Sequence, residues 1–171
     1  MFSDVQITQC LMGLHVKGTS NLTIQDSNIH DNGGVEYYAH NLYLRRDSDA
    51  NVQNSTFSDS PTGDGVNISY SDNITVQDCI LANNYFRGVR AADSSYIDVL
   101  DNTVSGNGQD GITMNSESTG VDDFRILSNT VTDNSVGIST SSDSSNGSVW
   151  YNSVSGNGTN LSIDSSSTSV K

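Results

Sequence analysis

The segment Gly111-Ile112-Thr113-Met114 belongs to a short motif that recurs about once every 24 residues along the chain. A small residue, glycine or asparagine, opens each copy, and apolar and polar residues then alternate. The other copies are Gly13-Leu14-His15-Val16, Asn41-Leu42-Tyr43-Leu44, Gly65-Val66-Asn67-Ile68, Gly88-Val89-Arg90-Ala91, Gly137-Ile138-Ser139-Thr140 and Asn160-Leu161-Ser162-Ile163. Alternation with a period of two residues predicts a β-strand with one buried face.

A second series of apolar anchors recurs at the same spacing. The anchors are Ile7, Ile24, Val52, Val76, Val99, Ile126 and Val149. Five residues after the last six of them come Ile29, Phe57, Leu81, Val104, Val131 and Val154. Each repeat therefore has room for three short strands and three turns. A disordered chain would not keep these columns aligned, so the sequence predicts an all-β solenoid of about seven coils, one domain over residues 1–171 with its first coil at 1–19.

The repeat units resemble those of right-handed parallel β-helices of the pectin-lyase-like superfamily. The units that carry the resemblance are Asn129-Thr130-Val131-Thr132-Asp133-Asn134 and Gly106-Asn107-Gly108-Gln109-Asp110-Gly111-Ile112. It covers roughly residues 4–164 and implies a right-handed parallel β-helix. It leaves the function open, because this superfamily contains lyases, hydrolases, epimerases and inert phage fibres.

The composition limits the classes of partner. The formal net charge is −13, which disfavours binding to nucleic acid and to anionic membranes. The sequence contains no run of 18 apolar residues that could span a bilayer. We therefore expect neither nucleic acid nor a membrane as a partner. The expected extracellular or cell-surface location belongs to the polysaccharide hypothesis given below.

The ends of the solenoid lack the usual caps. No amphipathic helix follows Ile163, and residues 161–171 are expected to form a frayed tail. Uncapped strand edges favour self-association. The chain is then part of a longer solenoid, a protein that associates through its ends, or a naturally short protein. A predicted outward apolar stripe of Leu100, Leu127 and Trp150 offers a second surface for self-association.

Three residues after each anchor lies a column of small or polar side chains. Its members are Cys10, Ser27, Ser55, Cys79, Asn102, Asn129 and Asn152. The three asparagines are expected to form an amide ladder. Cys10 and Cys79 would be buried thiols about 14 Å apart, too far for a disulfide.

Cations gather around the strand motif in the first four coils. They are Lys17, Arg45, Arg46, Arg87 and Arg90, accompanied by His15 and His40. Such a face suits an anionic ligand. The alternative is that these cations neutralise neighbouring aspartates.

Two adjacent columns would place ionisable groups on one face. The position before the motif reads His40, Asp64, Arg87 and Asp110, and the outward position within it reads His15, Tyr43, Asn67, Arg90 and Thr113. Asp64 and Asp110 would be about 9.6 Å apart, a separation that suits an inverting glycosidase. Arg87 would lie between them and hold a substrate carboxylate. The alternative is that the Asp-Gly pairs only form turns.

Two segments resemble enzymes of acidic polysaccharides. Residues 60–66 are similar to a polygalacturonase segment, which implies a catalytic role for Asp64, although Phe86-Arg87-Gly88 stands where that family has an Asp-Asp pair. Residues 21–27 and 30–33 are similar to mannuronan C5-epimerases, but the Asp-Pro-His-Glu motif of that family is missing. A lyase-type reaction would use Arg87 or Arg90 as the proton abstractor and Ca²⁺ or arginine to neutralise the sugar carboxylate. The sequence does not decide whether the protein needs a cofactor. Ca²⁺ is the candidate, and no metal-binding residues are predicted.

The second coil contains a longer loop, residues 30–40, which includes Tyr37 and Tyr38. These rings could stack on sugars or cover the loop's own apolar side.

The sequence thus favours a carbohydrate-active or carbohydrate-binding β-helix that acts on an acidic polysaccharide as a lyase, hydrolase or epimerase. The alternative is a non-catalytic module of a phage fibre, adhesin or surface protein. Candidate catalytic residues are His40, Asp64, Arg87 and Asp110, and candidate substrate-binding residues are His15, Tyr37, Tyr38, Tyr43, Arg45, Asn67 and Arg90.

Overall fold

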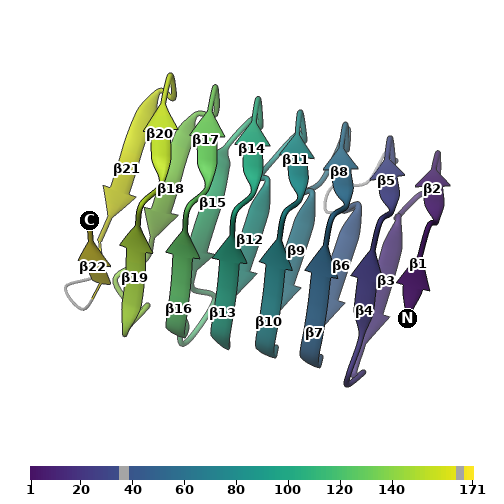
Figure 1. Ribbon diagram of the computed structural model, residues 1–171, viewed down its shortest axis with the longest axis horizontal. Coiled ribbons are helices and arrows are strands. Elements are labelled where there is room, and N and C mark those ends of the chain that lie inside the picture. Colours follow the sequence, from purple (N-terminus) through teal and green to yellow (C-terminus); the bar gives the residue numbers. More distant parts are fainter. Residues whose placement is uncertain (35–38, 165–167) are drawn as a thin grey trace.

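Three parallel β-sheets run side by side along one axis of the molecule (Figure 1). The computed structural model describes residues 1–34, 39–164 and 168–171. Within these residues all regular secondary structure is β-strand. The chain visits the three sheets in a fixed order and then begins the next coil. This arrangement confirms the predicted all-β parallel solenoid.

Each sheet collects one strand from each coil. The first sheet contains β1 (Phe2–Ser3), β4 (Thr23–Gln25), β7 (Ser48–Gln53), β10 (Asp72–Gln77), β13 (Ser94–Leu100), β16 (Val121–Leu127), β19 (Gly147–Trp150) and β22 (Thr168–Val170). The second sheet contains β2 (Gln6–Thr8), β5 (Asn28–His30), β8 (Thr56–Ser58), β11 (Ile80–Ala82), β14 (Thr103–Ser105), β17 (Thr130–Thr132) and β20 (Ser153–Ser155). The third sheet contains β3 (Leu14–Lys17), β6 (Leu42–Arg45), β9 (Val66–Ser69), β12 (Val89–Ala92), β15 (Asp110–Asn115), β18 (Val136–Thr140) and β21 (Thr159–Ile163).

The apolar columns predicted from the sequence form the core. Ile24 pairs with Val52, Val52 with Val76, and Val76 with Val99. All four side chains are fully buried. Burying apolar surface is the dominant favourable term in folding, so stacking of equivalent residues fixes the strand register.

The first coil differs from the predicted alignment. Ile7 pairs with Ile29 in the second sheet, whereas Phe2 is the partner of Ile24. The anchor of this coil is therefore Phe2, and the choice of Ile7 was wrong. Phe2 and Ile7 are five residues apart, as Ile24 and Ile29 are, so Ile7 belongs to the second apolar column and was assigned to the first.

Aspartate and asparagine occupy many of the sharp bends. Asp26, Asn54, Asp78 and Asp101 follow one another in successive coils with φ of 51°, 47°, 52° and 55°. These residue types tolerate the left-handed backbone region better than other non-glycine residues. The bends account for many of the polar residues. A hydrophobic content of only 33% is therefore compatible with a folded chain.

Two asparagine ladders brace the turns. The predicted ladder is confirmed: Asn102 Nδ2 donates to Asn129 Oδ1 and Asn129 Nδ2 to Asn152 Oδ1, both at 3.0 Å. A second ladder, eight residues after the anchors, was missed. Its amide-to-amide bonds join Asn84, Asn107, Asn134 and Asn157 in order at 3.0, 2.9 and 3.0 Å.

The second ladder continues across the coil between Asn32 and Asn84, which lacks its asparagine. Ser60 occupies this column in that coil, and the side chain of Asn41 bridges the gap. Asn32 Nδ2 donates to Asn41 Oδ1 at 3.0 Å, and Asn41 Nδ2 donates to Asn84 Oδ1 at 3.1 Å. An asparagine from the third-sheet motif thus replaces the missing amide.

The two cysteines lie in different environments. Cys79 is buried as expected, and burial raises the pKa of its thiol to about 11. Cys10 is exposed, so the expectation that it is buried was wrong. The cause is the shifted first coil, where Val5 rather than Cys10 contacts Ser27 through its backbone N–H. Both thiols are free.

This difference predicts selective alkylation. At pH 8 and under native conditions, iodoacetamide should modify Cys10 and leave Cys79 unmodified, because the thiolate is the reactive form. Peptide mass spectrometry measures both sites in one sample, and a reaction in denaturant serves as the control. Comparable native rates at the two sites would contradict the structure.

The tail also departs from the expected fraying. β22 pairs in parallel with β19 in the first sheet, and Trp150 Nε1 donates to Ser169 Oγ at 3.3 Å. Lys171 Nζ lies 4.4 Å from the centroid of the Trp150 ring. Leu100, Leu127 and Trp150 do form one column, but their side chains are only half-exposed. Within the described residues there is no helix with the length and apolarity to cross a membrane.

Candidate functional site

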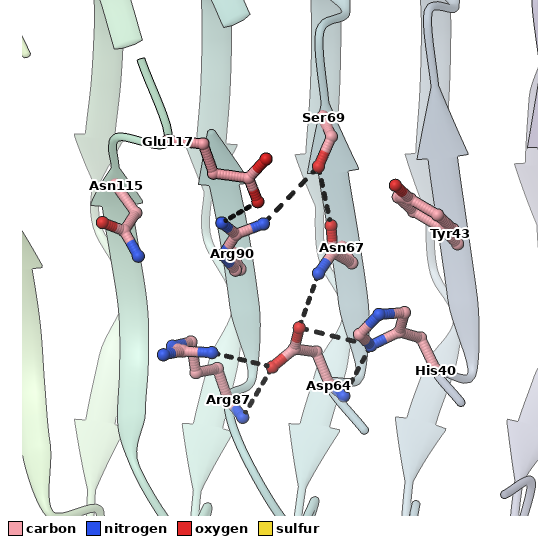
Figure 2. Close-up of a pocket in the computed structure, with 9 residues that line it drawn as sticks. All are labelled: His40, Tyr43, Asp64, Asn67, Ser69, Arg87, Arg90, Asn115 and Glu117. Carbon is pink, nitrogen blue, oxygen red and sulfur yellow. Dashed lines mark hydrogen bonds and ion pairs between the residues drawn. The ribbon is translucent and has the colours of Figure 1, made fainter. Parts of the chain in front are cut away.

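A cavity of about 410 Å³ opens on the third sheet (Figure 2). Its walls come from successive coils, at β6, β9, β12 and β15 and in the segments that flank them. The lining residues are His40, Tyr43, Asp64, Asn67, Ser69, Arg87, Arg90, Asn115 and Glu117. Six residues predicted as site residues, His40, Tyr43, Asp64, Asn67, Arg87 and Arg90, are brought together here.

Glycine immediately after Asp64 and Arg87 allows the coils to stack closely at the mouth of the cavity. A Cβ on Gly65 would lie 2.8 Å from the carbonyl oxygen of Gly88, and one on Gly88 would lie 2.6 Å from that of Gly111. The strand register places residues 64 and 87 in adjacent coils, two positions before the paired Val66 and Val89. The repeat thus builds a column of polar side chains.

Asp64 lies at the centre of the cavity floor. Its side chain is 1% exposed, Asn67 Nδ2 donates to Oδ2 at 2.7 Å, and the backbone N–H of Arg87 donates to Oδ1 at 3.0 Å. Arg87 Nη1 lies 3.7 Å from the same Oδ1. The carboxylate is therefore held by donors on both oxygens.

His40 is a buried, neutral ring. Burial lowers the pKa of His40; the Asp64 carboxylate opposes this shift, while Arg90 and Arg87 add to it. The backbone N–H of Asp64 donates to Nδ1 at 2.9 Å, so the neutral ring carries its hydrogen on Nε2. That nitrogen lies on the side of the ring away from the backbone of Asp64 (Figure 2).

Arg87 lies between Asp64 and Asp110 and bridges their two carboxylates. Its Nε donates to Asp110 Oδ2 at 3.2 Å, in addition to the contact with Asp64. Asp110 Oδ1 also accepts from Ser139 Oγ at 3.0 Å. Asp110 therefore lies behind Arg87 and does not line the cavity.

Arg90 forms the opposite wall. Its side chain is 10% exposed, and its Nη2 donates to Glu117 Oε1 at 2.7 Å. Tyr70 Oη donates to Glu117 Oε2 at 3.2 Å, which raises the pKa of Tyr70. Glu117 was missed in the sequence. The sign that the sequence offered was a longer coil. The anchors Val99 and Ile126 are 27 positions apart, whereas Val76 and Val99 are 23 apart, and the additional residues form the loop that contains Glu117.

Asp93 holds the loop that carries Glu117. Its Oδ1 accepts the backbone N–H groups of four consecutive residues, 117–120, at 2.9–3.1 Å. Burial alone would raise the pKa of Asp93, but these hydrogen bonds, led by that of Thr119, outweigh it and lower the pKa to about 2. The carboxylate thus acts as the anchor of the loop.

This anchor predicts an acid-dependent loss of stability. Because the pKa of Asp93 falls on folding, its ionised form stabilises the protein above pH 4, and that contribution disappears as the pH drops through 2. After allowance for solvent screening, we expect about 1 kcal/mol. Urea denaturation at pH 7, 4 and 2 measures the free energy of unfolding of wild type and Asp93→Asn, with Asp101→Asn as the control. A difference in free energy between wild type and Asp93→Asn that stays constant with pH would contradict the prediction.

The remaining predicted residues lie around the cavity. His15 stacks on Tyr43 with ring centroids 4.9 Å apart, and the guanidinium of Arg45 lies 6.0 Å from the centroid of the Tyr70 ring. Both extend the polar strip beyond the cavity. Tyr37 and Tyr38 lie outside the described residues.

The cavity does not fit a calcium ion. No group of three histidine, cysteine, aspartate or glutamate side chains in the described parts of the chain could hold a metal. The two carboxylates of the cavity, Asp64 and Glu117, are already paired with arginine, and guanidinium groups repel a cation. The fixed cations of the cavity are therefore Arg87 and Arg90.

Comparison with solved structures gives the same architecture. A mutant of the periplasmic alginate epimerase AlgG superimposes with a TM-score of 0.78 at 22% identity, over 91% of this chain and 35% of AlgG. The A-module of the mannuronan C-5 epimerase AlgE4 from Azotobacter vinelandii gives 0.55 at 18% identity, over 89% of this chain and 56% of the module. The AlgE6 A-module from the same organism gives a TM-score of 0.52 at 15% identity, over 89% of this chain and 57% of the module.

These likenesses concern the fold, and the chain spans between about a third and somewhat more than half of each of these structures. No curated protein sequence matches the chain. The family model described as the right-handed β-helix region matches residues 2–171. The chain therefore belongs to the right-handed parallel β-helix family, and the predicted handedness is confirmed.

Proposed function

We propose that this β-helix is a carbohydrate-active module that binds an acidic polysaccharide along its third sheet and acts on a uronate unit in the cavity. The observation that carries the proposal is a cavity lined by two arginines and a neutral histidine. An extracellular or cell-surface location belongs to the same proposal, because such polymers are found outside the cytoplasm.

The donors of the cavity suit a carboxylate. Arginine presents a planar set of N–H groups that matches a carboxylate with two parallel hydrogen bonds. Arg90 is buried and oriented by Ser69, whose Oγ lies 3.5 Å from Nη1. His40 Nε2–H adds a neutral donor on the cavity side. The epimerases of similar fold are named for alginate or mannuronan, which supports a uronate as the ligand.

The arrangement favours a lyase or epimerase reaction over inverting hydrolysis. Both of these reactions begin with loss of the proton next to the carboxylate, which becomes easier when a cation neutralises that charge. Inverting hydrolysis needs two carboxyl groups that are free to exchange protons around a water. Asp64 and Asp110 instead both contact Arg87, so their proposed role is to hold this arginine.

Tyr43 and His40 are the proposed catalytic pair. The lowered pKa of His40 keeps the ring neutral, and its Nδ1 is occupied by the Asp64 N–H, so His40 donates a hydrogen bond through Nε2 to the developing oxyanion and keeps its proton. Tyr43 also lines the cavity and contacts His40 edge-on at 5.4 Å between centroids. In its phenolate form Tyr43 would take the proton next to the carboxylate, and the resulting phenol would then return a proton to the product or to solvent.

Incubation with polymannuronate, alginate and polygalacturonate tests the proposal. A lyase product absorbs at 235 nm, an epimerase exchanges the C5 proton for deuterium in D₂O without this absorbance, and a hydrolase only releases reducing ends. We expect one of the first two outcomes. His40→Ala and Tyr43→Phe should each lower the rate at least about 100-fold.

His30→Ala is the matched control, because His30 lies on β5 of the second sheet and does not line the cavity. It should retain most of the activity. If no polyuronate yields product or binds in calorimetry, the proposal is wrong and a non-catalytic structural module remains.

A further inference from the structure

We propose that Glu117 determines specificity by occupying the place of a substrate carboxylate on Arg90 until a polyuronate displaces it. This inference rests on the proposed function and assigns a role to a residue outside the proposed catalytic pair. Glu117 would then act as an internal competitor that only an anionic sugar can replace.

The first support is that a carboxylate fits this position. Glu117 places one oxygen 2.7 Å from Arg90 Nη2 and the other 3.2 Å from Tyr70 Oη. Both oxygens thus have a donor, and the group lies on the wall of the cavity where Arg90 faces Asn67 and Ser69 (Figure 2). A uronate carboxylate has the same shape and charge.

The second support is the contrast in exposure between the two partners. The Arg90 side chain is 10% exposed and lies on β12 inside the sheet, whereas the Glu117 side chain is 48% exposed and belongs to a loop. An exposed ion pair is weak because water competes for both charges. The carboxylate is therefore the partner that can leave, while the arginine stays in place.

The third support is the charge balance of the cavity. With His40 neutral, Arg87 is paired with Asp64 and Asp110, whereas Arg90 is paired with Glu117. Departure of Glu117 leaves one positive charge without a partner in a partly buried site, which is unfavourable. A uronate restores the balance and a neutral sugar does not, so the exchange discriminates between them.

Asp93 acts in this scheme as a positioning residue. Its four hydrogen bonds from the N–H groups of residues 117–120 fix the backbone of the loop. Glu117 can then rotate away through its side-chain torsions alone and return after the ligand leaves. The loop itself need not refold.

Calorimetry with three proteins and two ligands tests the inference. The proteins are wild type, Glu117→Gln and Asp101→Asn, which removes one exposed carboxylate far from the cavity. The ligands are a mannuronate hexamer and cellohexaose as the neutral sugar. We expect Glu117→Gln to bind the acidic hexamer about tenfold more tightly than wild type, with cellohexaose unchanged and Asp101→Asn within about twofold of wild type.

An independent readout is the titration of Tyr70 by NMR. Because the uronate is proposed to pair with Arg90 and not with Tyr70, the hydrogen bond that raises the pKa of Tyr70 is lost on displacement. Saturation with the acidic hexamer should therefore lower that pKa towards its value in Glu117→Gln. Wild type that binds the hexamer as tightly as Glu117→Gln, or more tightly, would overturn the inference and leave the proposed function intact. If neither protein binds the hexamer, the proposed function itself fails.

Discussion

Replacement of Arg90 with alanine is expected to weaken binding of a mannuronate hexamer about 100-fold, or about 2.7 kcal/mol. Arg90 is the buried cation of the cavity, and its carboxylate partner is the exposed Glu117. Removing a hydrogen-bonded guanidinium takes away the charge that a uronate would pair with. Calorimetry at a single ionic strength measures the loss.

Arg125→Ala is the matched control for this substitution. Arg125 is also paired with an aspartate, Asp98, but it lies on β16 of the first sheet and its side chain is 58% exposed. Its loss should change hexamer affinity by less than about twofold. Arg90→Lys retains the charge without the planar fork and should fall between wild type and alanine. Wild-type affinity in a folded Arg90→Ala protein would disprove the assignment.

The fold was predictable because burial and period act on every coil. A strand of a parallel β-helix contributes alternate side chains to the core. The spacing alone therefore identifies Val52, Val76 and Val99 as core residues. The error in the first coil has a physical cause. Phe2 and Ile7 are both apolar and are five residues apart, like Ile24 and Ile29, so hydrophobicity alone does not distinguish which of the two is the anchor.

The positions of the cavity residues followed from the same period, but their interactions did not. The column of His40, Asp64, Arg87 and Asp110 is present as predicted, since strand register is transmitted from coil to coil. Spacing does not reveal that the Asp64 N–H donates to His40 or that Arg87 holds two aspartates. Those contacts depend on side-chain torsions and local turns.

The repeat also did not predict the roles of the loop residues. Glu117 and Asp93 act through a turn that has no counterpart in the neighbouring coils, so no column marks them. The repeat predicts what all coils share, and specificity arises where one coil departs from the others. The longer interval between Val99 and Ile126 was the available sign.

The second asparagine ladder gives the largest expected effect on stability. Asn107→Ala should lower the free energy of unfolding by about 3 kcal/mol, because several buried groups lose their partner at once. Asn107 Oδ1 accepts from the backbone and side chain of Asn84, and its Nδ2 donates to Leu81 O and Asn134 Oδ1. Alanine can replace none of these bonds.

Urea denaturation followed by circular dichroism measures the change, with the m-value as the check that the transition stays cooperative. Asn28→Ala, at an exposed position on β5, is the control and should cost less than about 0.5 kcal/mol. Equal destabilisation by the two substitutions would show that the ladder contributes nothing specific.

The same substitution should also weaken ligand binding, although Asn107 is not among the residues that line the cavity. A Cβ on Gly88 would lie 3.1 Å from Asn107 Nδ2, and one on Gly65 would lie 2.9 Å from Asn84 Nδ2. The ladder therefore packs directly against the two glycines that follow Arg87 and Asp64. Loss of Asn107 frees that backbone, so hexamer affinity should fall several-fold in Asn107→Ala and remain at the wild-type value in Asn28→Ala.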